Sequence, residues 1–449
     1  MSATVITQTR TRAALSHRKR PVPRRTGGPR RGRQTSLLES EPGFEEASEE
    51  RKLARRFEVV KGTYARHPLH SLVKWHGRFT HYETRWAIES FLGGRSGSTV
   101  LDPFCGSGTV LLEAVLAGHW AYGLDCDPLA RLVAKVKTTP LPPNLRESDF
   151  RPIRLFLDNL EVPESLTSEL AQFQNRDHWF TPSAQSGLAR ILYSIRAVDD
   201  PDFRDMLMVS LANVVRPVST ADPKQIFPER TAHFEAKRPH VSEGHVIRLF
   251  RQEVWRVVGL LTRFVPQARA SVIGDDARHI PLPDGSERSG VGLVDTNPPY
   301  IGAIDYVRAF RLERYVLQLV ERDSDIRRKW IGQDRTDPSA FYADMGRVVG
   351  EIARVLQPGG YCVLRTANVR VHDVSLDVVD RFKTLFADVG MDHIVKVTDR
   401  ISDERRTLFF VNRKHNGYIA EDYQLVFRKP GWSGSKSGLT TPTATRRIG

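Results

Sequence analysis

The chain has 449 residues, is 40% hydrophobic and 27% charged, and carries a formal net charge of +14. This is ordinary globular composition, with room for one large domain or two to three smaller ones. No apolar run reaches the ~18 residues that span a bilayer, and no signal-peptide core stands at the N-terminus. The three cysteines follow no metal-ligand spacing. The sequence therefore predicts a cytoplasmic protein with no membrane contact, no structural disulfide and no metal.

The excess positive charge lies mostly at the N-terminus, where residues 1–35 contain ten Lys and Arg and no Asp or Glu. Such a polar segment cannot bury enough apolar surface to offset its ordering entropy. Residues 1–57 are therefore predicted to be a disordered basic tail and a linker with a short helix, and the folded body to begin near Val59. The tail could be a solvated extension, a nonspecific nucleic-acid contact or an organellar transit peptide, and the sequence leaves all three open.

Strand and helix patterns alternate from residue 99 onward, which predicts an α/β fold with a parallel sheet and helices on both faces. Apolar periodicity also predicts that residues 141–267 form a mostly helical insertion, interrupted by a polar loop at 216–243. Residues 431–449 are expected to be a flexible C-terminal tail. The predicted strands are 99–101, 121–124, 270–273, 291–294, 361–364, 393–397, 407–411 and 423–427, and the predicted helices are 109–117, 128–137, 188–198, 203–215, 244–265 and 339–356.

The first strand ends in the string Asp102-Pro-Phe104-Cys-Gly106-Ser-Gly108-Thr. Glycines at these two positions allow a tight turn and close approach of a ligand, and the helix that follows directs its first N–H groups at an anion. Asp125 ends the next strand, 23 residues after Asp102, close to the ~20-residue offset of acids that bind a ribose. A P-loop is disfavoured because no Lys follows the second glycine. The pattern favours a site for an adenosyl cofactor whose carboxylate meets the helix.

A second motif, Asn297-Pro298-Pro299-Tyr300, follows the strand at 291–294. An amine attached to an aromatic ring is a poor nucleophile because its lone pair is delocalised. Hydrogen bonds to the Asn297 side-chain oxygen and the Pro298 carbonyl would draw that lone pair out of conjugation, and Tyr300 could stack on the ring. The prolines would fix the backbone for this contact. The motif predicts methylation of a planar amine. Carbon-5 methylation, which needs a thiolate, is disfavoured because no cysteine is placed to attack a ring carbon.

At these residues the chain resembles the amino-methyltransferases of bacterial restriction–modification systems, which methylate cytosine N4 or adenine N6. The resemblance covers roughly residues 60–430 and implies a class I, Rossmann-like fold with S-adenosyl-L-methionine as cofactor. It implies that residues 58–140 and 268–430 form the catalytic domain, with residues 141–267 as a candidate target-recognition region. Double-stranded DNA, and a companion restriction endonuclease, are the implied partners. The matching segments are His67–Phe79, Asp102–Thr109, Gly123–Ala130, Gly274–Arg278 and Asp305–Arg308.

The resemblance also implies roles for individual residues. Asn297, Pro298, Pro299 and Tyr300 would be catalytic, and the segment Gly274–Arg278 supplies Asp276, whose carboxylate would approach the cofactor's adenine. With it, the predicted cofactor-binding residues are Asp102, Phe104, Gly106, Gly108, Asp125 and Asp276.

Two questions stay open in the sequence. The motif Asn297–Tyr300 is called the clamp motif below. Asn at its first position is commoner in adenine-N6 enzymes, whereas Thr296 before it and Asp305-Tyr306 after it favour cytosine N4. The insertion at residues 141–267 falls between the segments Gly123–Ala130 and Gly274–Arg278, whereas the target-recognition regions of this family usually occupy another place in the motif order. Three other functions compete: methylation of guanine N2 in RNA, methylation of protein glutamine, and a binding module without activity.

Overall fold

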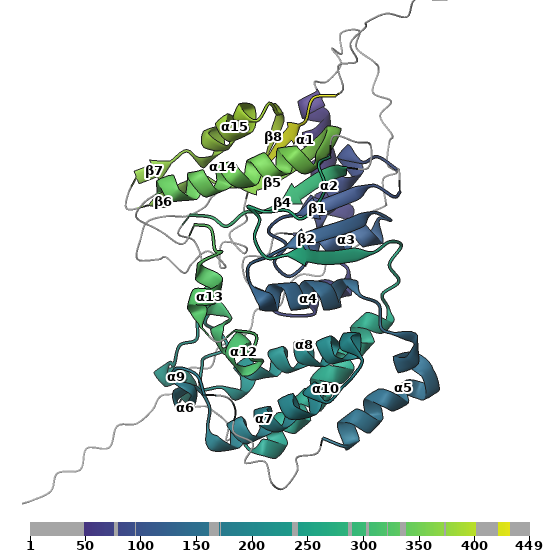
Figure 1. Ribbon diagram of the computed structural model, residues 1–449, viewed down its shortest axis with the longest axis vertical. Helices are drawn as coiled ribbons and strands as arrows, with labels where there is room; N and C mark the ends of the chain where they lie inside the picture. Colours follow the sequence, from purple (N-terminus) through teal and green to yellow (C-terminus); the bar gives the residue numbers. More distant parts are fainter. Residues whose placement is uncertain are drawn as a thin grey trace, which may run out of the picture. The chain divides into compact units, whose positions relative to one another are not determined.

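A computed structural model of the protein describes residues 49–75, 80–94, 96–160, 170, 172–235, 241–285, 290–301, 305–320, 322–332, 338–371, 374–400 and 421–431 (Figure 1). The predicted tail at residues 1–35, the strand predicted at 407–411 and residues 432–449 lie outside the described residues.

The described strands form a seven-stranded sheet in the order β3-β2-β1-β4-β5-β9-β8, with a separate β6-β7 hairpin. The first five strands pair in parallel, as the alternating pattern predicts. The C-terminal strand β9 departs from this prediction, because it runs antiparallel to both β5 and β8. The strands are β1 (Thr99–Asp102), β2 (Trp120–Leu124), β3 (Ala270–Gly274), β4 (Val291–Thr296), β5 (Leu356–Thr366), β6 (Val369–Val371), β7 (Val374–Leu376), β8 (Asp392–Arg400) and β9 (Glu421–Arg428).

Alternate residues of the central strands enter two different apolar cores, as expected for a sheet covered on both faces. Val100 and Leu293 point into one core, to which helices α1 to α4 and the helical insertion also contribute buried side chains. Leu101 and Val294 point into the other, with α14 and α15. The helices of these layers are α1 (Glu49–Thr63), the 3-10 turn η1 (Pro68–Ser71), α2 (His81–Phe91), α3 (Thr109–Leu116), α4 (Pro128–Thr138), α14 (Pro338–Val355) and α15 (Val378–Asp388).

The folded body begins before Val59, the residue predicted from the sequence. Helix α1 already starts at Glu49 and runs through the segment predicted as a linker. Its Phe57 is fully buried and meets the Trp86 ring edge-on, with 5.4 Å between ring centroids. A short helix was predicted in this segment, but its mixed charge gave no sign that the helix packs into the folded body.

The segment Gln357–Gly360 also differs from prediction, since it lies inside β5 rather than forming a turn before it. Leu356 pairs with Val291 and Tyr361 pairs with Leu293, so five steps along β5 face two along β4. The extra residues bulge out of the ladder, and Gly359 adopts a φ of +79° that favours glycine.

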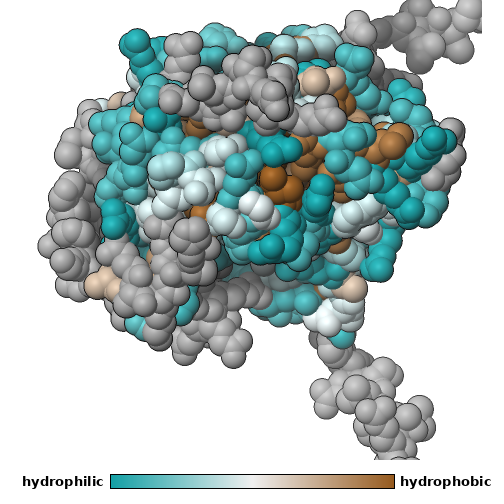
Figure 2. All heavy atoms as spheres, turned by 90° about the horizontal axis from the view of Figure 1, so that it is seen from below, coloured by the Kyte–Doolittle hydropathy of each residue, from teal (hydrophilic) through white to brown (hydrophobic). Residues whose placement is uncertain are grey.

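The insertion is a bundle built on α5, α7, α8 and α10, whose inward faces join the first core. Asp200 and Ser242 cap the N-termini of α8 and α10 with their side chains, as their types predict. Seen from below, where this bundle lies, the surface is mainly hydrophilic with scattered apolar patches (Figure 2). The elements are α5 (Pro143–Asp158), α6 (Arg176–Trp179), α7 (Pro182–Arg196), α8 (Pro201–Val218), α9 (Ala232–Glu235) and α10 (Glu243–Thr262).

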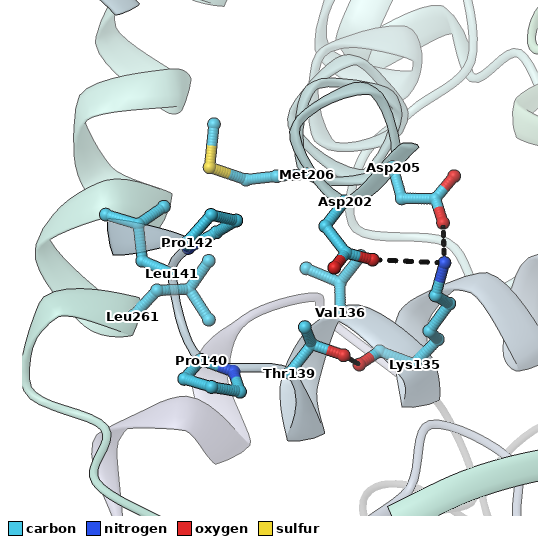
Figure 3. A pocket seen from close by; sticks show the side chains of 10 residues that line it. All are labelled: Lys135, Val136, Thr139, Pro140, Leu141, Pro142, Asp202, Asp205, Met206 and Leu261. Atoms are coloured by element: carbon cyan, nitrogen blue, oxygen red, sulfur yellow. Dashed lines mark hydrogen bonds and ion pairs between the residues drawn. The ribbon is translucent and has the colours of Figure 1, made fainter. Parts of the chain in front are cut away.

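A small crevice marks the junction between α4 of the sheet layer and α8 of the insertion (Figure 3). Lys135 of α4 reaches across it to Asp205 at 2.7 Å and Asp202 at 3.3 Å. Such half-exposed ion pairs contribute about 0–1 kcal/mol, so the shared apolar core, and not these charges, holds the bundle to the sheet.

Across the described ranges, no helix is both long and apolar enough to cross a membrane. Within the same residues, no group of three or more His, Cys, Asp or Glu side chains could hold a metal ion.

Candidate active site

The two sequence motifs meet at the centre of the sheet, where β1 and β4 are neighbours. The chain leaves β1 toward β2 on one side, while β4 lies on the other, so this is the point at which strand order reverses. Ligands of open α/β sheets bind at such a point, beyond the carboxyl ends of the strands. The Thr296 hydroxyl of β4 donates to Asp102 Oδ1 of β1 over 2.7 Å and joins the two motifs directly.

The glycine loop after β1 packs closely against helix α4. Gly106 and Gly108 have φ of +48° and +78°. A Cβ added to Gly108 would lie 2.9 Å from the Ala134 Cα, which belongs to the backbone of α4. The loop thus brings its backbone against α4 and starts helix α3 at Thr109. The first N–H groups of α3 then face the loop edge, where they suit a carboxylate.

Asp102 carries an unused acceptor at this edge. Its Oδ1 accepts from Thr296 and from the Phe104 N–H at 3.1 Å. Its Oδ2 is buried and has no hydrogen-bond partner among the described residues. Burial raises the pKa of this carboxyl to about 7. A buried acceptor without a partner is costly, and the ammonium of a methionine moiety would satisfy it.

Asp125, the predicted ribose ligand, also holds the glycine loop. Its Oδ2 accepts from the Gly106 N–H and its Oδ1 from the Asp127 N–H, both at 2.9 Å. Burial raises its pKa to about 6. Each carboxylate oxygen keeps a second lone pair, so these contacts orient the group and still leave acceptors for two hydroxyls.

The third predicted acid, Asp276, lies just past β3, at the same edge as Asp125. Arg278 holds it in a bidentate pair, with Nε to Oδ1 and Nη2 to Oδ2 both at 2.9 Å. Burial would raise the pKa of Asp276, but the hydrogen bonds from Arg278 outweigh it and lower the pKa. The carboxylate is therefore ionised and fixed in orientation just past the end of β3.

Asp295 differs from the sequence expectation that it follows its strand. It is the fifth residue of β4, fully buried, and forms an ion pair with Arg365 at 2.5 Å. Its role is structural, inside the sheet.

The clamp motif begins one residue after Thr296. The Asn297 side-chain Oδ1 is buried and has no hydrogen-bond partner among the described residues. Pro298 is buried, while Pro299 and Tyr300 are half-buried. Phe104 of the glycine loop and Tyr300 pack against the same apolar core. An unpaired amide oxygen and an aromatic ring therefore stand together at this edge of the sheet.

The cysteine of the loop is not an available nucleophile. Cys105 is buried, and burial raises the pKa of its thiol well above the usual value, with Asp125 adding to the effect. Its Sγ lies 3.0 Å from where a Cβ on Gly123 would be. A small side chain is needed here for packing, consistent with the argument against carbon-5 chemistry.

Two residues at the site, Trp75 and Arg314, were given no individual role from the sequence. The Trp75 indole nitrogen lies 3.6 Å from an added Gly106 Cβ, and its ring stacks on Phe310 at 4.2 Å between centroids. Arg314 of α12 (Arg311–Val316), fully buried, donates to Asp127 Oδ2 at 2.7 Å. Trp75 falls within the segment His67–Phe79 noted from the resemblance, of which residues 76–79 lie outside the described residues. Only the folded chain brings these residues to the loop.

We expect Gly108→Ala to abolish saturable binding of S-adenosyl-L-methionine and to lower the stability by more than about 1 kcal/mol, because alanine at positive φ is strained and its Cβ would collide with backbone. Calorimetric titration and thermal unfolding would measure the two effects. Gly350→Ala is the matched control, since nothing lies within 4 Å of that helical position. Unchanged cofactor affinity in the Gly108 variant would contradict the assignment of the loop.

Comparisons with known proteins agree with this geometry. Residues 87–138, which contain the glycine loop and Asp125, match the family UPF0020, the RMKL-like methyltransferase domain. The type II methyltransferase M.MvaI of Kocuria varians is 23% identical over 355 residues, covering 68% of this chain and 77% of that protein. M.BsoBI of Geobacillus stearothermophilus is 22% identical, and the match covers 57% of this chain and about half of that protein, 53%.

A solved structure of a SAM-dependent methyltransferase from Methanosarcina mazei covers 77% of this chain and 97% of its own, at 10% identity and a TM-score of 0.30. The sheet order, with β9 antiparallel to both of its neighbours, is that of a Rossmann-like methyltransferase sheet carrying a helical insertion. The resemblance inferred from the motifs is confirmed: the chain is similar to type II methyltransferases, and its glycine-loop segment matches a methyltransferase domain family.

Proposed function

We propose that the protein is a site-specific DNA methyltransferase that transfers the methyl group of S-adenosyl-L-methionine to an exocyclic base amine, with cytosine N4 as the favoured acceptor. One observation carries the proposal. Asn297 Oδ1 is a buried acceptor with no partner in the described residues, one residue away from a direct hydrogen bond between the two motifs. An amine that enters this position would satisfy it.

The cofactor, when bound, supplies a methyl group on a positively charged sulfur. Asp102, the start of α3 and Asp125 would hold its ammonium, carboxylate and ribose, and Asp276 would approach its adenine. Asn297 Oδ1 and the Pro298 carbonyl would accept hydrogen bonds from the acceptor NH2, so that its lone pair leaves conjugation with the ring. Transfer of the methyl group to the amine then requires only positioning and electrostatic stabilisation, without a covalent enzyme intermediate.

A base inside a duplex cannot reach a buried acceptor at a strand edge, so the target base would be flipped out of the helix. Tyr300, the half-buried last residue of the motif, would stack on the flipped ring. DNA as the substrate is supported by the type II methyltransferases to which the chain is similar. In this scheme residues 58–140 and 268–430 do the chemistry, and the helical insertion at 141–267 contributes to target recognition.

Cytosine N4 is favoured over adenine N6 by the residues around the clamp. Thr296 hydrogen bonds to Asp102, and Asp305 caps the N-terminus of α11 (Tyr306–Ala309) by accepting from the Arg308 N–H. These are the neighbours that resemble the cytosine-N4 group, whereas Asn297 itself is commoner among adenine-N6 enzymes.

The proposal predicts that purified protein transfers labelled methyl groups from the cofactor to duplex DNA, and not to tRNA or a glutamine-containing peptide. Sequencing of modified bases in DNA from cells that express the protein would report the base and the site together. N4-methylcytosine at one recurring sequence is the expected result. N6-methyladenine there would correct the base and keep the reaction, and methylation of tRNA alone would refute the DNA assignment.

A further inference from the structure

Because β9 runs in the opposite direction to β5, it brings a distant part of the chain to the end of the sheet at which the two motifs meet. Since β9 is antiparallel to β5, its first residues lie where β5 ends, and Thr366 pairs with Tyr423. Strand β8 ends at the same edge, where Asp399 pairs with Asp422. The carboxyl ends of β1 and β4 also lie there, so Asp422 comes beside the clamp although it is 122 residues from Tyr300.

Asp422 makes a direct contact with the clamp. The Tyr300 hydroxyl donates to Asp422 Oδ1 over 3.0 Å, and the same oxygen accepts from the Tyr423 N–H at 3.1 Å. This hydrogen bond fixes the position of the Tyr300 hydroxyl and with it the direction in which the ring extends from the backbone, because rotation about χ1 would break the contact.

A cluster of buried charged side chains surrounds Asp422 and restricts the movement of the Asp422 side chain. Glu83 of α2 and Asp399 of β8 are both 2% exposed, and Arg365 of β5 is fully buried. Lys61 of α1 pairs with Asp399 at 2.6 Å. Burial, with the nearby Glu83 charge adding to it, raises the pKa of Asp422 to about 8. Asparagine keeps an oxygen that can accept from the Tyr300 hydroxyl and the Tyr423 N–H, so it would be a close substitute for Asp422.

We propose that Asp422 is a positioning residue, which sets the orientation of the Tyr300 ring and thereby the surface on which the acceptor base stacks. The stacking role rests on the proposed function, whereas the orienting contact does not. Asp422 touches neither cofactor nor base in this scheme. It acts through the Tyr300 hydroxyl, and its effect on methyl transfer should vanish when that hydroxyl is removed.

A double-mutant cycle tests this dependence. Asp422→Ala and Tyr300→Phe should each lower kcat/KM for DNA about tenfold, as expected for one lost hydrogen bond, with cofactor affinity unchanged. The double variant should be no slower than either single variant, and Asp422→Asn should stay within about threefold of the parent. Asp392→Ala is the matched control, since Asp392 is exposed at the other end of the same strand pair. Independent, multiplying losses would overturn the proposal.

A second measurement keeps the test independent of DNA. With 3-fluorotyrosine at position 300, the fluorine resonance should shift or broaden in Asp422→Ala relative to the parent, because the neighbouring hydroxyl loses its partner, and it should stay unchanged in Asp392→Ala. An unchanged resonance in Asp422→Ala would overturn the proposal whatever the substrate. A shifted or broadened resonance in a protein that does not methylate DNA would refute the proposed function and support the positioning role.

Discussion

Asn297→Ala is expected to lower methyl transfer to duplex DNA by about 100- to 1,000-fold, the usual effect of removing one group that stabilises a transition state. The Asn297 Oδ1 is buried without a partner among the described residues, so nothing in that part of the structure would take over its contact with an amine. The affinity for S-adenosyl-L-methionine should not change, because the predicted cofactor ligands are on other strand ends. Initial rates of label transfer and calorimetric titration would separate the two quantities.

Asn159→Ala is a suitable control for this variant, since Asn159 is exposed at the end of α5. It should leave the rate and the affinity as they are in the parent. Full activity of Asn297→Ala would remove this residue from the chemistry, and joint loss of activity and cofactor binding would show that the change has damaged the fold of the site.

Arg365→Met should destabilise the protein by about 3–5 kcal/mol, the range measured when one partner of a buried ion pair is removed. Arg365 and Asp295 are both fully buried, with 2.5 Å between Nη1 and Oδ1, and Glu83 Oε2 lies 4.0 Å from the Arg365 Nε. Methionine fills a similar volume but leaves two buried carboxyls without this cation. Urea unfolding at pH 7 would give the change in free energy.

The matched control is Arg328→Met, which removes a surface pair with Asp325 in which the arginine side chain is 71% exposed. Exposed pairs contribute about 0–1 kcal/mol, so this variant should stay close to the parent. Similar unfolding free energies for the two variants would mean that the buried pair contributes no more than a surface one.

The elements around the glycine loop were predictable because local signals there agree with each other. A short apolar run, two glycines and a buried apolar helix gave β1 and α3 to within one residue. Asp127 and Pro128 marked the start of α4, where the Asp127 side chain accepts from the Leu129 N–H. By contrast, the burial of α1 and the bulge inside β5 depend on partners distant in sequence. The sequence therefore predicted only a short helix in a linker at the start of α1, and it did not predict the bulge.

The sequence by itself determined which groups are candidates for the chemistry: the glycine loop, the acids at strand ends and the Asn-Pro-Pro-Tyr motif, since each depends on residue types at short spacing. Only the tertiary structure decided which of these groups are available. It paired Asp295 with Arg365, left Asn297 Oδ1 and Asp102 Oδ2 without partners in the described residues, and carried Asp422 to Tyr300. The reason is physical, because burial and hydrogen-bond partners across a sheet depend on strand order and direction, which no local pattern encodes.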